Sequence, residues 1–178
     1  DHIRGEAIGY VDDVIDAAPP AIKQMLDVFE RVGGPVLAVE RVPREDISSY
    51  GVIATEPSAG LGEGIYRVKD LVEKPSLQDA PSDLAIIGRY ILTPDIFPIL
   101  AATKSDRTGE IQLTNGLREL VKKRPIFACE IKGVRHDTGN KLGYLKAVVY
   151  FALRRPDLAD KFTAYLASLG LPTPAGKR

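Results

Sequence analysis

The residues at positions 72–75, Val-Glu-Lys-Pro, combine side chains that could bind a phosphorylated sugar. Pro75 has no N–H group and cannot continue a central strand, so the apolar run before it should end here. Glu73 and Lys74 then lie at the carboxyl end of a strand, where open α/β sheets bind their ligands. A carboxylate accepts hydrogen bonds from sugar hydroxyls, and an ammonium holds a phosphate. A solvated strand end is the alternative interpretation of this pair.

Two aspartate-containing stretches are candidates for a metal site. Asp12 and Asp13 follow one possible strand, and Asp137 follows another. Magnesium prefers hard oxygen ligands and takes one or two carboxylates, with phosphates and water completing its coordination. The alternatives are a polar turn at the first stretch and an Asx turn or helix cap at the second. His136 is interpreted as a packed or solvated neighbour, because the sequence offers no serine or cysteine arrangement that would need a base.

Two further stretches place glycine beside polar residues. Gly51 comes just before an apolar strand, and its amide could reach a sugar because no side chain blocks the approach. An ordinary turn glycine is the alternative. The string Gly-Glu-Ile-Gln-Leu-Thr at residues 109–114 is interpreted as a structural corner between a strand and a helix, with Thr114 as the helix N-cap. A functional role for this string is the minority interpretation.

The elements that must position these residues alternate between strands and helices, which predicts a three-layer α/β domain. Apolar runs predict strands at residues 6–11, 35–42, 52–54, 65–73, 84–92, 126–131 and 134–136. Helical spacing predicts helices at residues 20–32, from Thr93 onward, at 114–121 and over two stretches after residue 140. Thr93 before a proline is predicted to be an N-cap, and Gly33 is predicted to end the first helix.

The composition excludes some classes of function. The chain has 178 residues, and its 24 lysines and arginines balance its 24 aspartates and glutamates. Non-specific attraction to nucleic acid or to a membrane surface is therefore not expected. Cys129 is the single cysteine and is predicted to be a small core residue. A cytoplasmic protein is the expectation.

In their order along the chain, several strings resemble the carboxyl-terminal part of the bacterial UTP–glucose-1-phosphate uridylyltransferases. The strings lie at residues 50–53, 71–75, 80–82, 84–90, 109–114, 137–139 and 141–146. The resemblance implies a sugar-nucleotidyltransferase fold, which is a Rossmann-like three-layer α/β fold. It further implies a partial nucleotidyltransferase domain at residues 1–139, followed by carboxyl-terminal helices and a tail at residues 140–178.

The resemblance also implies a reaction, in which glucose 1-phosphate attacks the α-phosphorus of UTP and gives UDP-glucose and pyrophosphate. Lys74 would then be the catalytic residue that holds the sugar phosphate. Glu73 and the Gly51 amide would bind the sugar, and Asp12 and Asp137 would bind Mg2+. Because family members use their carboxyl-terminal helices for subunit contacts, a homo-oligomer is expected.

One family feature is missing from the sequence. No Gly-x-Gly-Thr-Arg string occurs, and Val11 stands where the family has glycine. The fold is therefore expected to lack its amino-terminal nucleotide-binding segments. The first residue is Asp1, so a fragment, a processed product or a sequence without its beginning is expected. The alternatives are an inactive truncated remnant that acts as a binding or oligomerisation module, and a thymidylyl or cytidylyl transferase.

Overall fold

The computed structural model describes residues 6–9, 12–56, 60–105 and 109–170. Its contacts divide the chain into two compact units. The first unit contains Asp1–Val11 and Ile15–Val134, and the second contains Asp12–Val14 and Arg135–Arg178. The predicted domain boundary between residues 139 and 140 falls inside the second unit, and it stays a prediction.

The first unit is built on a mixed sheet. Its strands are β1 (Glu6–Gly9), β3 (Val36–Arg41), β4 (Gly51–Glu56), β5 (Ile65–Glu73), β6 (Leu84–Leu92) and β7 (Phe127–Glu130). They are ordered β1-β6-β3-β7-β5-β4, and β4 also pairs with β6 through Val52 and Ala85. Only β3 and β7 run parallel, and the other paired strands are antiparallel. This sheet confirms most of the predicted strands, although residues 10–11 of the first one lie outside the described residues.

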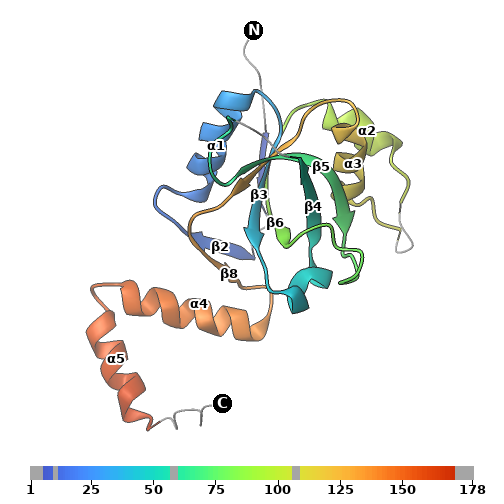
Figure 1. Ribbon diagram of the computed structural model, residues 1–178. Helices are drawn as coiled ribbons and strands as arrows, with labels where there is room; N and C mark the ends of the chain where they lie inside the picture. The colour runs from blue at the N-terminus through green and yellow to red at the C-terminus, as the bar shows by residue number, and fades with distance from the viewer. Residues whose placement is uncertain (1–5, 10–11, 57–59, 106–108, 171–178) are drawn as a thin grey trace. The chain divides into compact units, whose positions relative to one another are not determined.

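Helices cover both faces of this sheet. Figure 1 shows α1 (Ala21–Val32) on one side of the strands and α2 (Ile96–Ala102) and α3 (Leu113–Val121) on the other. A short 3-10 helix, Arg44–Ser49, precedes β4. Helix α1 ends as predicted, since Gly33 adopts a left-handed φ of 64° and its N–H bonds to the carbonyl of Phe29. The predicted three-layer α/β architecture is therefore confirmed within this unit.

Both predicted threonine N-caps are wrong. Helix α2 begins two residues after Pro94, and the Thr93 hydroxyl instead donates to the Asp95 carboxylate and accepts from Arg124. Helix α3 begins one residue before Thr114, whose side chain is buried inside the first turn. In both cases a tertiary partner uses the hydroxyl that would otherwise cap the backbone.

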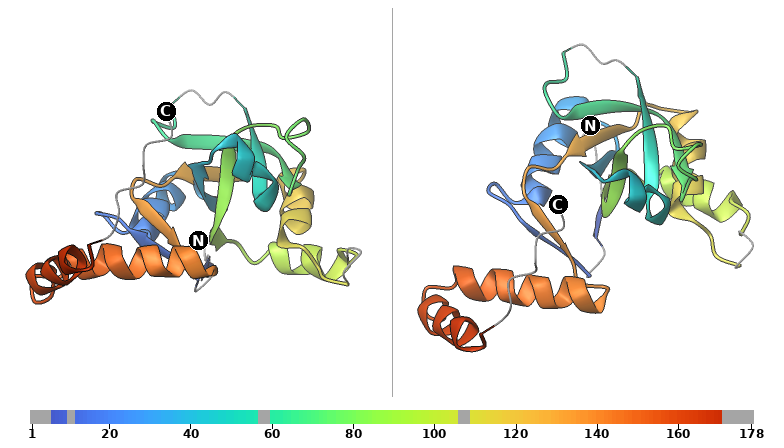
Figure 2. Two further views of the ribbon diagram at one scale, coloured as in Figure 1. Left: turned by 90° about the horizontal axis from the view of Figure 1, so that it is seen from below. Right: turned by 60° about the horizontal axis from the view of Figure 1, so that its bottom comes forward.

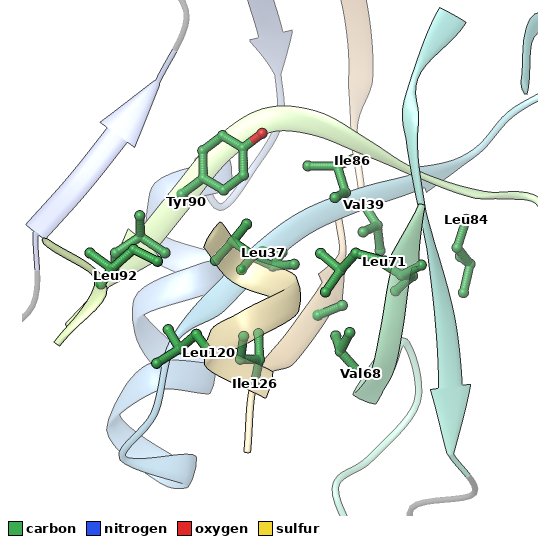
Figure 3. Packing of buried hydrophobic residues seen from close by; sticks show 14 of the residues in the cluster. Leu37, Val39, Val68, Leu71, Leu84, Ile86, Tyr90, Leu92, Leu120 and Ile126 are labelled. Atoms are coloured by element: carbon green, nitrogen blue, oxygen red, sulfur yellow. The ribbon is translucent and has the colours of Figure 1, made fainter. Parts of the chain in front are cut away.

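Two clusters of buried side chains hold the layers together. One cluster lies under α2 and α3 and includes Leu37, Ile126, Leu117 and Leu120, of which Leu37, Ile126 and Leu120 are among those drawn in Figure 3. The other cluster lies under α1 and includes Met25, Val28, Ile87 and Cys129, in accord with the predicted core position of the cysteine. Burying each such leucine contributes roughly 1.5–3 kcal/mol to folding.

A bidentate ion pair also fastens α3 to β5. Arg118 donates from Nε and Nη2 to the two oxygens of Asp70, at 2.8 and 2.9 Å. Burial raises the pKa of the Asp70 carboxyl, but the hydrogen bonds and positive charge of Arg118 outweigh it and hold that pKa below its ordinary value. The pair lies three residues before the end of β5, so it fixes α3 relative to the strand end that carries Glu73.

The second unit is mainly helical. The chain passes between the units within β2 (Asp13–Asp16) and β8 (Val134–Asp137), which form a two-stranded sheet. Helix α4 (Lys141–Arg154) ends before Pro156, and α5 (Ala159–Ser168) turns away from its axis (Figure 2).

Apolar side chains of the second unit stay exposed. On α4, Leu142 and Leu145 are 61% and 59% exposed, whereas Ala147 is buried. No helix in the described part of the chain is long and apolar enough to cross a membrane.

Candidate functional site

The backbone turns sharply at the carboxyl end of β5. The strand ends at Glu73, as the following proline predicts, and Lys74 has a φ of 44°. Lys74 is the only non-glycine residue with a positive φ within the described ranges. A lysine in this region costs roughly 1–2 kcal/mol, and such strain collects at functional sites. Because Lys74 is exposed and its N–H bonds to the carbonyl of Tyr50 at 3.0 Å, the strained turn is fixed while its ammonium faces solvent.

Gly51 lies opposite Glu73 in the β4–β5 pairing. A Cβ atom on Gly51 would lie 3.0 Å from Glu73 Oε2 and 3.3 Å from Thr114 Oγ1. These separations are tighter than nine in ten real Cβ contacts, so a larger residue at position 51 would require the side chain of Glu73 or Thr114 to shift by a few tenths of an ångström. The structure therefore gives a second reason for this glycine, besides the predicted access of its amide to a sugar, which stays a prediction.

Thr114 completes this cluster of polar groups and was missed as a site residue. Its Oγ1 donates to Glu73 Oε2 at 2.6 Å, although 41 positions separate the two residues. Thr114 is buried and Glu73 is half-buried, so water competes little for the hydrogen bond. The only signal in the sequence was that Thr114 belongs to the string at residues 109–114, which we interpreted as a structural corner.

We expect Gly51→Ala to weaken, roughly tenfold, the binding of glucose 1-phosphate that the family resemblance predicts for this site. The added methyl group would push the Glu73 carboxylate or the Thr114 hydroxyl from its place, at a cost of roughly 1–2 kcal/mol. Isothermal titration of the wild-type and Gly51→Ala chains measures the change. Ala54→Ser, on the same strand, is the matched control and should bind as the wild type does; equal affinity of the Gly51→Ala chain would contradict the predicted crowding.

Two carboxylates meet in the second unit, at the turn between β8 and α4. A Cβ atom on Gly139 would lie 2.9 Å from Asp12 Oδ2 and 3.2 Å from Asp137 Oδ1. Both carboxylates thus lie close to the backbone of Gly139, at a position where a side chain would be crowded. The structure thereby brings together the two aspartates that were predicted as metal ligands, while their metal role stays a prediction.

The hydrogen bonds of Asp137 also match the alternative interpretation of this stretch as an Asx turn or helix cap. Its Oδ1 accepts from the N–H of Gly139 at 2.9 Å, as in an Asx turn, and its Oδ2 accepts from Asn140 Nδ2 at 3.0 Å. The Asn140 side chain in turn caps α4 by accepting from the N–H of Gly143 at 2.8 Å. Two lone-pair directions on each Asp137 oxygen leave room for a metal beside these bonds.

The neighbours of these aspartates have structural partners. Asp13 forms an ion pair with Arg135 at 2.8 Å, and both side chains are largely buried. His136 packs against Tyr150 and Phe151, with ring centroids 4.2 and 5.2 Å apart. This packing agrees with the prediction that His136 is a packed neighbour.

The donor set at Asp12 and Asp137 limits which metals fit. No group of three or more histidine, cysteine, aspartate or glutamate side chains within the described residues could hold an ion. Transition-metal sites built wholly from protein side chains need such a group. A pair of hard oxygen ligands instead fits Mg2+, which takes its remaining ligands from phosphate and water.

Comparison with known proteins assigns most of the chain to one family model. Residues 10–152 match the model described as Nucleotidyl transferase. The chain is 45% identical over 163 residues to UTP–glucose-1-phosphate uridylyltransferase 2 of Streptococcus pyogenes serotype M3, covering 89% of this chain and 54% of the relative. A UTP–glucose-1-phosphate uridylyltransferase of Streptococcus pneumoniae matches at the same identity and coverage. The chain therefore spans about half the length of the curated relatives it matches.

Solved structures give the same result. A UDP-glucose pyrophosphorylase complexed with UDP-glucose superposes with a TM-score of 0.78 at 44% identity, covering 84% of this chain and 56% of that one. The UDP-glucose pyrophosphorylase from Acinetobacter baumannii superposes with a TM-score of 0.81 at 29% identity, covering 94% of this chain and 57% of that one.

Proposed function

Because the chain belongs to the nucleotidyl transferase family, we propose that it forms the sugar-phosphate-binding part of a UTP–glucose-1-phosphate uridylyltransferase. Such an enzyme transfers the uridylyl group of UTP to glucose 1-phosphate and releases pyrophosphate. The observation that carries the proposal is the strained turn at Lys74, which directly follows Glu73, the residue that pairs with Gly51. The matched relatives, named for this activity, support it.

The chemistry of the transfer suits these residues. The attacking atom is a phosphate oxygen, which is already ionised at neutral pH, so the reaction needs no general base. The remaining work is to hold two anionic substrates in line and to stabilise the charge that develops on pyrophosphate. Lys74 would hold the sugar phosphate as a point charge, and Glu73 would accept hydrogen bonds from sugar hydroxyls.

We propose Mg2+ as the cofactor, with Asp12 and Asp137 as its protein ligands. When bound, the ion would neutralise negative charge on phosphate oxygens. The Asp137 carboxylate is oriented for this role by the N–H of Gly139 and by the side chain of Asn140. Gly139 keeps the space between the two carboxylates open.

A pyrophosphate-release assay with glucose 1-phosphate, UTP and Mg2+ tests the proposal, together with a calorimetric titration of glucose 1-phosphate. Turnover supports the full reaction, and replacement of UTP by dTTP or CTP tests the alternative nucleotides. Binding of glucose 1-phosphate without turnover supports the sugar-phosphate-binding part alone. The proposal would be overturned if the chain neither released pyrophosphate nor bound glucose 1-phosphate.

We also propose that the chain forms a homo-oligomer through α4 and α5. Leu142, Leu145 and Tyr165 are each more than half exposed, and apolar side chains gathered on paired helices are typical of a contact surface. A cytoplasmic location stays the expectation from composition.

Replacing Leu145 with glutamate is expected to shift this oligomer to a monomer, because a charge cannot be buried in an apolar contact without a partner. Size-exclusion chromatography with light scattering measures the mass. Lys146→Glu, at the next and also exposed position, is the control that should leave the mass unchanged. A wild-type chain that is monomeric at high concentration would refute the proposal.

A further inference from the structure

We propose that Thr114 is a positioning residue that fixes the Glu73 carboxylate for sugar recognition. The inference rests on the proposed function, in which Glu73 accepts hydrogen bonds from the sugar. Its physical basis is the 2.6 Å hydrogen bond from Thr114 Oγ1 to Glu73 Oε2. A glutamate at a strand end otherwise samples several rotamers, and ordering it on binding costs conformational entropy.

The donor of this hydrogen bond is itself held rigidly. Thr114 is 7% exposed and lies in the first turn of α3. Three and six residues later, Leu117 and Leu120 are fully buried in the core under this helix. Arg118 fastens the same helix to Asp70 of β5. The hydroxyl and the strand end that carries Glu73 therefore belong to one rigid arrangement, which pre-organises the carboxylate.

The arrangement also distinguishes the two oxygens of the carboxylate. Oε2 accepts the Thr114 hydroxyl and lies beside Gly51, where even a Cβ atom would be crowded. Oε1 is then the oxygen best placed to accept a hydrogen bond from a sugar hydroxyl. A fixed acceptor rejects an analogue that lacks the partner hydroxyl, because the carboxylate would be left without that bond. We therefore assign to Thr114 a share in the selectivity among sugar 1-phosphates, in addition to affinity.

A purely structural role makes a different prediction. Valine has nearly the same shape as threonine but cannot donate, whereas serine keeps the donor. If Thr114 only fills space, Thr114→Val should bind sugars as the wild type does. If Thr114 positions Glu73, the loss of sugar affinity should depend on the Thr114 hydroxyl and on the presence of the Glu73 carboxylate.

The test measures dissociation constants by calorimetry for glucose 1-phosphate and for its monodeoxy analogues. Thr114→Val is expected to bind glucose 1-phosphate roughly tenfold more weakly, and its preference over the analogue that lacks the recognised hydroxyl should fall by a similar factor. Thr114→Ser should stay within about twofold of the wild type. In a Glu73→Ala background, which has no acceptor for the Thr114 hydroxyl, Thr114→Val should cause little further loss. Thr114→Ala removes the same hydroxyl and replaces Thr114→Val if that variant does not fold.

The outcomes separate this inference from the proposed function. If the wild-type chain binds glucose 1-phosphate and Thr114→Val binds it with the same affinity and selectivity, the role of Thr114 is overturned while the proposed function stands. The role of Thr114 would also be overturned if Thr114→Val lowered the affinity for glucose 1-phosphate by the same factor whether or not Glu73 is present. A wild-type chain that does not bind glucose 1-phosphate would overturn both.

Discussion

Replacing Lys74 with alanine is expected to weaken binding of glucose 1-phosphate ten- to a hundredfold, and to reduce uridylyl transfer at least a hundredfold in any active form. The ammonium is the cationic side chain that the proposed site offers to the sugar phosphate, and a hydrogen bond to a charged group is worth roughly 1.5–3 kcal/mol. Calorimetry with glucose 1-phosphate and pyrophosphate release measure the two effects. Lys69→Ala, an exposed lysine of β5, is the matched control and should leave both quantities unchanged.

A glycine at the same position separates function from stability. Lys74 holds a φ of 44°, which glycine adopts without strain. Lys74→Gly is therefore expected to lose binding as alanine does while its free energy of unfolding stays equal or rises. If both variants still bind glucose 1-phosphate as the wild type does, Lys74 is not part of the binding site. A large decrease in the free energy of unfolding of Lys74→Gly would contradict the strained turn.

Replacing Asp137 with asparagine is expected to reduce Mg2+-dependent turnover at least a hundredfold and to weaken metal binding. The amide oxygen can still accept from the N–H of Gly139, so the local turn should survive. The negative charge that a divalent cation needs is lost. Paramagnetic broadening by Mn2+, followed at Gly139 by NMR, reports metal binding without requiring activity.

The control for this variant is Asp157→Asn, which removes another carboxylate of the second unit. Asp157 pairs with Arg155 on the surface, at 2.7 Å, so its loss should not affect the metal. Unchanged Mn2+ broadening at Gly139 in Asp137→Asn would show that Asp137 is only a turn residue. Loss of the Mn2+ broadening in both Asp137→Asn and Asp12→Asn would support the proposal that the two aspartates bind the metal together.

Local chemistry explains which parts of the fold the sequence predicted. Pro75 ends β5 because it lacks an N–H group, and Gly33 ends α1 because it adopts a left-handed φ easily. Both signals act within one or two residues of the boundary they set. The two residues that the resemblance assigned to the sugar, Gly51 and Glu73, lie opposite one another in the β4–β5 pairing.

Tertiary contacts explain what the sequence did not predict. Thr114 looked like an N-cap because threonine before a helical pattern usually caps it, but its hydroxyl donates to Glu73 on another element. Thr93 was misread in the same way, because Asp95 and Arg124 bind its hydroxyl. A capping signal depends on the next three residues, whereas Glu73 and Arg124 lie far from these threonines in the sequence and reach their hydroxyls only through the tertiary fold.

The carboxylate pair shows a further limit of local reasoning. Asp12 and Asp137 lie far apart in the sequence, and only the resemblance to a family suggested that they meet. The structure adds that Gly139 leaves the space between them open. The apolar pattern of α4 predicted a face but not its partner, because periodicity does not specify what covers a face.

The central claim is that glucose 1-phosphate binds at the strand end formed by Gly51, Glu73 and Lys74. An NMR titration of the 15N-labelled chain with glucose 1-phosphate tests it most directly. We expect saturable shifts of the Gly51, Lys74 and Thr114 amide resonances in the wild type and in Lys69→Ala. In Lys74→Ala, the shifts of Gly51 and Thr114 should need roughly ten- to a hundredfold more glucose 1-phosphate. Saturable binding without shifts of these three amide resonances, or no binding by the wild-type chain, would contradict binding at this strand end.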